Sequence, residues 1–211
     1  GVGLGEVADH PILDDLGALL ERPHEVCDQL IALPTLIRPV ALARLCEVVG
    51  ALDALPADLT RYYRGLDVAR PIINLEPCYE GLGRFRGTAR HSAADVRRAS
   101  WTGVVSGAAA GLGYGAHGVW SWHRRGEGFS AEDVHGAPFP FSVAAAFPGA
   151  EDVAYLRRVV DAERLWGLDA APDLLVAEPS GAVAGRTPDG TIAVYAPTPF
   201  SLTLGGVEPD G

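Results

Sequence analysis

Residues 71–77 read PIINLEP, a short run of apolar and β-branched residues that ends abruptly at Glu76 and Pro77. Such a run is typical of a buried parallel strand that delivers a polar residue at its C-terminal end. Residues 112–123 read LGYGAHGVWSWH, and the alternating glycines predict a second strand with close backbone contacts.

A helix is expected between these two strands. Ser92 stands three residues before Asp95, an acidic relative of the capping box, and predicts the beginning of the helix. Gly111 is the expected stop. A strand, a helix and a second strand in this order form one βαβ unit, which predicts an α/β fold with a parallel sheet.

The flanking segments have different patterns. Residues 10–65 show helical spacing, with a last short helix that begins at Pro56 and ends near Gly65. Residues 124–148 are expected to form a long loop over one end of the sheet, and residues 150–166 an amphipathic helix.

The pattern changes to period two after Pro172. A proline, an aspartate and a glycine at 188–190 predict a hairpin turn. The short strands expected around this turn cover residues 174–177, 182–186, 191–196 and 200–204. They predict a small antiparallel β module that continues beyond Gly211.

Composition excludes several classes of partner. The chain has 211 residues, 48% of them apolar, and a formal net charge of −10. This acidity disfavours nucleic acid and anionic membrane surfaces, which bind clustered basic residues. A neutral small molecule or a sugar fits better.

The ends and the cysteines of the chain carry little functional information. No apolar run reaches the roughly 18 residues of a membrane span, and the N-terminus lacks the pattern of a signal peptide. A chain without any methionine is expected to be a fragment or a processed product, so cytoplasmic and secreted locations both stay open. Cys27, Cys46 and Cys78 have no zinc or disulfide spacing, and no metal or cofactor is expected. The sequence does not predict an oligomeric state.

Glu76 is the first candidate for chemistry. A carboxylate at the end of a buried strand is costly to leave unpaired, and strand ends carry the active sites of (β/α) barrels. One interpretation makes Glu76 catalytic, and the other makes it a structural partner of a nearby arginine: Arg84, Arg86 or Arg97. Glu80 is a second carboxylate near the same edge, expected to orient the first.

Aromatic residues gather around both predicted strand ends: Tyr79, Tyr114, Trp120 and Trp122, with His117 and His123 between them. Flat aromatic faces beside polar groups suit a sugar ring, whereas the alternative is ordinary aromatic core packing. His117 alone would be a hydrogen-bonded structural histidine, but beside Glu76 and Tyr114 it is a candidate substrate contact.

The sequence resembles the apiosidase-like glycoside hydrolases, bacterial proteins with a catalytic (β/α) barrel, over about residues 60–211. The stretches that carry the resemblance are PIINLEPCYEG at 71–81, DVRRASW at 95–101, GAAAG at 107–111, YGAHGVWSW at 114–122 and FPGA at 147–150. The ending resembles the small β domain of that family described as collagen-binding.

The resemblance implies a partial TIM-type barrel over residues 1–170, with its early strands missing, and a small antiparallel β domain over residues 171–211. The implied function is cleavage of a glycosidic bond in a plant or bacterial polysaccharide by two carboxylates. Glu76 would be one of them. Its partner is unassigned, with Glu6 as a weak candidate, and the chain is expected to be incomplete and inactive alone.

The substrate contacts expected from the aromatic cluster and the resemblance together are Tyr79, Glu80, Arg97, Tyr114, His117, Trp120 and Trp122. A non-catalytic carbohydrate-binding or cell-surface module is the alternative, because it would keep the aromatic platform without a complete acid pair. A second carboxyl group within roughly 5–10 Å of Glu76 would favour the enzyme.

Overall fold

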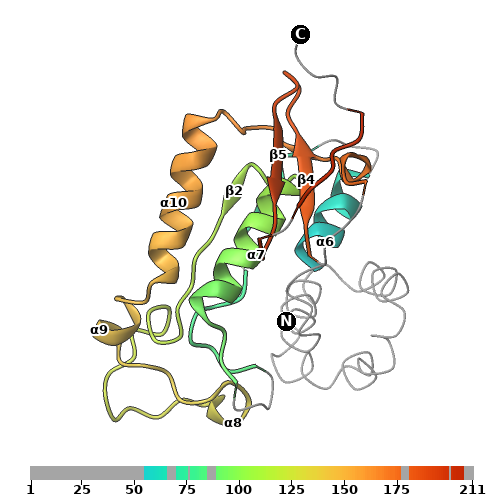
Figure 1. Ribbon diagram of the computed structural model, residues 1–211. Coiled ribbons are helices and arrows are strands. Elements are labelled where there is room, and N and C mark those ends of the chain that lie inside the picture. Colours follow the sequence, from blue (N-terminus) through green and yellow to red (C-terminus); the bar gives the residue numbers. More distant parts are fainter. Residues whose placement is uncertain are drawn as a thin grey trace, which may run out of the picture. The chain divides into compact units, whose positions relative to one another are not determined.

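The computed structural model describes residues 55–65, 70–75, 77–84, 89–176, 181–199 and 201–206 (Figure 1), all within the unit Leu52–Gly211. Several predictions fall outside these residues: the helices expected over 10–54, the candidate acids Glu6 and Glu76, and Arg86. They stay predictions.

The βαβ unit is confirmed. Strands β1 (Ile73–Asn74) and β2 (Gly111–Leu112) pair in parallel, and helix α7 (Ala93–Val105) connects them. The register places Ile73 opposite Gly111. Ser92 caps α7 in a complete capping box with Asp95, as the sequence predicted.

Helix α7 ends earlier than expected. The Gly107 N–H donates to the Val104 carbonyl (3.0 Å) and the Ala108 N–H to the Gly103 carbonyl (2.9 Å), the two bonds of a Schellman motif. Gly107 has a φ of 110°, a left-handed conformation that favours glycine. Gly111 therefore begins β2 instead of ending the helix, and the prediction for Gly111 was wrong.

Both strands are shorter than predicted, and β1 is not buried. Ile73 is 51% exposed and Leu75 is 69% exposed. The two residues share one face of the strand because side chains alternate along it. The strand predicted over 112–123 gives way to turns after Ala116, where Gly118 has a φ of 124°. A left-handed residue interrupts the extended backbone that a longer strand needs.

The main core lies between α7 and helix α10 (Gly149–Ala162), which run side by side (Figure 1). The predicted amphipathic helix is thus confirmed, although it ends before Trp166. The buried residues of this core are Val104, Leu156, Val160, Leu165 and Leu168. Helix α6 (Leu55–Arg64), the predicted short helix, joins this region where the Arg64 side chain donates to the Leu168 carbonyl (3.1 Å).

The expected long loop contains two single-turn helices, α8 (Glu132–His135) and α9 (Phe141–Ala144). The Gly83 N–H donates to the His135 carbonyl (2.8 Å), which ties this segment to the chain beyond β1. Figure 1 shows α8 and α9 beyond the N-terminal ends of α7 and α10. The segment therefore lies at the end of the sheet where the parallel strands terminate.

The antiparallel β module is present with altered limits. Strands β3 (Asp169–Ala170), β4 (Val183–Arg186) and β5 (Ile192–Tyr195) form an antiparallel sheet in that order. The predicted hairpin turn is confirmed by the Gly190 N–H, which donates to the Thr187 carbonyl (3.0 Å).

The outer strands of this module were predicted wrongly. Residues 172–174 form a 3-10 helix, η1 (Pro172–Leu174), because a proline at its first turn fixes a helical φ. Beyond it, Leu175 and Leu204 form an isolated antiparallel bridge in place of two strands. The sheet packs on α7, where the rings of Trp101 and Tyr195 stack at 5.8 Å.

Candidate active site

The chains that follow β1 and β2 stay side by side beyond the regular ladder. The Glu80 N–H donates to the Gly115 carbonyl (2.9 Å), and the His117 N–H donates to the Glu80 carbonyl (2.8 Å), which forms a parallel bridge between Glu80 and Ala116. Between this bridge and the Asn74–Leu112 pair, the first chain has five residues in its sequence and the second chain has three.

Glu76 belongs to this longer segment in the sequence but lies outside the described residues. Its neighbour Tyr79 is half-buried. The Tyr79 ring lies against Gly115, where a Cβ would overlap it. The glycine at 115 thus allows an aromatic ring to lie directly on the facing chain.

Glu80 is buried, with only 5% of its surface exposed. Its Oε2 accepts two hydrogen bonds of 2.8 Å, one from the Tyr114 hydroxyl and one from the Gly149 N–H at the beginning of α10. A Cβ on Gly149 would overlap this oxygen. Two charge-assisted hydrogen bonds offset part of the cost of burying the carboxylate.

Tyr114 is held in its donor state. Burial, followed by the hydrogen bond to Glu80, raises the pKa of the Tyr114 phenol above its ordinary value. A phenol is protonated at neutral pH even at its ordinary pKa, and the shift moves its ionisation further from neutral pH, so the hydroxyl donates to Glu80.

His117 is completely buried. Its Nε2 lies 2.9 Å from the Gly136 carbonyl, which can only accept, so Nε2 carries the proton and Nδ1 is an acceptor. Nδ1 is buried without a hydrogen-bond partner among the described residues. Burial lowers the pKa of His117, which favours the neutral imidazole, and the Gly136 hydrogen bond opposes this shift.

The aromatic residues form two contact groups. His117 stacks with Trp120 at 6.0 Å and meets the edge of Phe129 at 5.3 Å. Trp122 stacks flat on Phe141, with ring centroids 4.7 Å apart and planes 2° from parallel. Trp120 is 47% exposed and Trp122 is 72% exposed, so both rings also face solvent.

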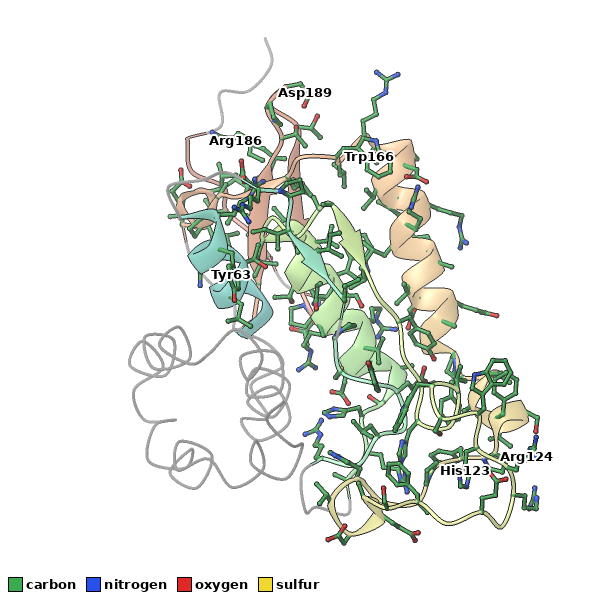
Figure 2. The ribbon with its side chains drawn as sticks, turned by 180° about the vertical axis from the view of Figure 1, so that it is seen from behind. Tyr63, His123, Arg124, Trp166, Arg186 and Asp189 are labelled. Carbon is green, nitrogen blue, oxygen red and sulfur yellow. The ribbon has the colours of Figure 1, made fainter. Side chains whose placement is uncertain are left out.

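Trp122 adopts a left-handed backbone conformation with a φ of 49°. This conformation is rare for a bulky residue and is often found at functional sites. The turn is held by the Trp122 N–H, which donates to the Val119 carbonyl, and by the His123 N–H, which donates to the Gly118 carbonyl, both at 3.0 Å. Figure 2 shows His123 and Arg124 at the end of the described unit where α8 and α9 lie. It shows Trp166 at the opposite end.

Arg97 lies on α7. Its side chain forms an ion pair at 3.1 Å with Asp152, which lies in the first turn of α10. The structure therefore brings together Glu80, Tyr114 and His117, and it stacks Trp120 on His117. It places Trp122 on Phe141, and it pairs Arg97 with the beginning of α10.

Two residues of this region were not singled out from the sequence. Gly149 supplies an N–H to Glu80, and its signals in the sequence were its place just before a predicted helix and within the FPGA stretch of the family resemblance. Phe141 supports Trp122 from a segment expected to be a loop, and no sequence pattern pointed to it.

Within the described ranges, no group of three or more potential metal ligands occurs. Likewise, no helix in this part of the chain is long and apolar enough to cross a membrane.

Comparison with known proteins identifies the family. Residues 56–167, just over half of the chain, match the model of the apiosidase-like catalytic domain. The chain belongs to the apiosidase-like family, as its motifs suggested. This membership supports a glycosidase-type hydrolase.

Solved structures show a related fold. Two chains, one titled a glycoside hydrolase and one titled a glycoside hydrolase family 5 protein from Bacteroides vulgatus ATCC 8482, each match with a TM-score of 0.56 and 20% identity. The matches cover 64% of this chain, and 31% and 30% of the two solved chains. This chain thus spans less than a third of either protein. No curated protein matches the sequence.

Proposed function

We propose that this protein cleaves a glycosidic bond in a plant or bacterial polysaccharide by a two-carboxylate mechanism. The observation that carries the proposal is the family match over residues 56–167, which includes the parallel strand pair and the segments that follow it. The substrate is a carbohydrate, and no cofactor takes part.

Glu76 is the proposed catalytic carboxylate, acting as nucleophile or general base. It comes two positions after the last residue of β1 in the sequence, and the catalytic groups of (β/α) barrels stand at the C-terminal ends of strands. A partner acid would protonate the leaving oxygen from roughly 5–10 Å away. That partner belongs to an earlier strand, and Glu6 stays its weak candidate.

Trp122 is the proposed stacking platform for a sugar. Phe141 supports one face of the indole, and the ring is 72% exposed. The apolar C–H face of a pyranose matches such a surface. The left-handed backbone at Trp122 supports the assignment, because strain of this kind is retained where it serves a site.

Of the remaining predicted contacts, Tyr79, Tyr114 and Trp120 would surround the sugar from the chains beyond β1 and β2. The completely buried His117 would support the Trp120 ring on which it stacks. Arg97 would act at the edge of the site. The proposed architecture is a partial (β/α) barrel over residues 1–170, followed by the β module over 171–211.

The test is release of reducing sugar from xylan, arabinan, pectin and a bacterial exopolysaccharide. It is run on this chain and on a version extended at its N-terminus. Hydrolysis of at least one polysaccharide by either protein is the expected result. Binding without hydrolysis by both proteins would instead support a non-catalytic carbohydrate-binding module, and neither binding nor hydrolysis would contradict both functions.

A further inference from the structure

Glu80 connects three segments of the molecule through one side chain. Its backbone is bonded on both sides to the chain beyond β2, through Gly115 and His117. Its carboxylate reaches a third segment, the first residue of α10, 69 positions further along the sequence. Two neutral donors among the described residues form hydrogen bonds to this buried carboxylate: the phenol of Tyr114 and the backbone N–H of Gly149.

Helix α10 has no cap of its own. Its N-cap residue is Pro148, and no side-chain hydrogen bond caps the helix locally. The first N–H groups of a helix have no partners within the helix, and its N-terminal dipole favours negative charge. The Glu80 carboxylate accepts from the first of these N–H groups and so caps α10 from a distant strand end.

The close approach depends on Gly149. Any other residue there would place a Cβ on the Glu80 Oε2. The same hypothetical Cβ would lie 3.3 Å from the Tyr114 ring. A side chain at this position would displace the Glu80 carboxylate from the helix end, so glycine preserves the contact among the tyrosine, the carboxylate and the helix.

From this geometry we infer that Glu80 is a positioning residue: it caps α10 and orients the Tyr114 hydroxyl rather than binding substrate. It fixes the chain four residues after Glu76, so its importance for catalysis rests on the proposed function. The capping of α10 by Glu80 is independent of the proposed function. This role differs from the sugar contact that the sequence suggested for Glu80.

The experiment measures hydrogen exchange of the Gly149 amide by NMR in the full chain. The variants are Glu80→Ala, Glu80→Gln and Tyr114→Phe, with Glu151→Gln as the matched control. Glu151 is exposed in the first turn of α10, so its replacement removes one charge at the same helix end.

Glu80→Ala should raise the exchange rate of the Gly149 amide at least tenfold. Glu80→Gln should keep most of the protection, because its amide oxygen can still accept both hydrogen bonds. Tyr114→Phe and Glu151→Gln should leave Gly149 protected. Unchanged Gly149 exchange in a folded Glu80→Ala variant would overturn the capping role. Should Glu80→Ala fail to fold, loss of Gly149 protection in Tyr114→Phe, with full protection in Glu80→Gln, would overturn it instead.

A kinetic measurement separates positioning from substrate contact. On the panel polysaccharide that the wild type hydrolyses best, Glu80→Ala should lower kcat and leave KM within about threefold, since the sugar-binding surface is retained. Glu80→Gln should restore kcat, because its amide oxygen still accepts both hydrogen bonds. A tenfold or larger rise in KM with Gly149 still protected would make Glu80 a substrate ligand and contradict the inference. If no polysaccharide is hydrolysed, the proposed function fails, while the exchange data still decide whether Glu80 caps α10.

Discussion

The two ends of the region formed by β2 and α10 differ in their chemistry. Where the strands terminate, Glu80 and Tyr114 are joined to the start of α10, and the exposed Trp122 lies nearby in the sequence. Toward the opposite end, an apolar groove of about 360 Å³ runs along the start of β2 and one side of α10, from Ala150 in the first turn of the helix to Val160 and on to Trp166. Trp166 marks that end in Figure 2.

The difference separates groups that perform chemistry from groups that pack. The charge in the groove belongs to Arg157, which pairs with Asp161 at 2.8 Å and lies over the Trp166 ring. The other lining residues are aliphatic or glycine, apart from Trp166. The strand end instead holds a buried carboxylate and a phenol with a raised pKa, and such environments are typical of active sites.

The largest effect is expected at Glu76. Glu76→Gln should lower turnover by about a thousandfold or more and leave sugar affinity largely intact, because the carboxylate acts chiefly in the transition state. Reducing-sugar release and isothermal titration with the same oligosaccharide would measure both quantities. Full activity in this variant would remove Glu76 from the mechanism.

The next effect is on stability and contrasts the two ends directly. Glu80→Ala should cost about 3 kcal/mol, since it leaves a buried N–H and hydroxyl without their acceptor. Val153→Ala in the groove should cost about 1 kcal/mol or less, because Val153 borders open space. Urea unfolding would measure the free energy of unfolding of both variants. An equal loss of stability in the two variants would contradict the proposed difference between the two ends.

The aromatic platform should affect binding at one end only. Trp122→Ala is expected to weaken sugar binding about tenfold, the contribution of one good aromatic contact. Trp166→Ala, at a tryptophan that lines the groove and is 47% exposed, should leave affinity unchanged. A weaker affinity in both variants would point to a general loss of structure.

The pH dependence of stability should reveal His117. Burial lowers its pKa in the folded state below the unfolded value of 6.5, so between these two values the unfolded chain binds more protons. Stability should therefore fall on acidification below about pH 6.5, by at most about 1.4 kcal/mol per pH unit from this residue. His117→Gln should reduce that slope, while His91, whose pKa is also lowered by burial, maintains part of it. An unchanged slope would show that His117 does not titrate in this range.

The smallest effect belongs to Arg97. Its ion pair with Asp152 is largely open to solvent, so Arg97→Ala should cost only a few tenths of a kcal/mol. Sugar affinity measured on the same variant tests whether Arg97 also serves the site. A loss of about 2 kcal/mol or more in stability, well above the range of exposed ion pairs, would make this pair a major connection between α7 and α10.

Local sequence signals predicted the βαβ unit better than its limits. The capping box at Ser92 is contained in four residues, so the sequence shows it directly. The end of α7 was harder to predict from the sequence, because Gly107 and Gly111 are equally good local signals for the end of a helix. The pairing of Gly111 with Ile73 selects between them, and that pairing joins residues far apart in the sequence.

The site shows the same contrast. The sequence placed Glu80 and Tyr114 near one another because adjacent parallel strands end at one edge. It could not show that Glu80 is buried, because burial depends on Gly149, which approaches from 69 residues away. The support of Trp122 by Phe141 is likewise a contact made through a turn that no periodicity reveals.

A crystal structure of Glu76→Gln bound to an oligosaccharide tests the two-carboxylate account most directly. The measured quantity is the distance from the substituted side chain at position 76, across the scissile bond, to the nearest carboxyl group. The account predicts a second carboxyl group at roughly 5–10 Å, with the sugar stacked on Trp122. In the N-terminally extended protein, which would supply the earlier strands, a sugar bound with no carboxyl group in that range would contradict the account and favour a non-catalytic binding module.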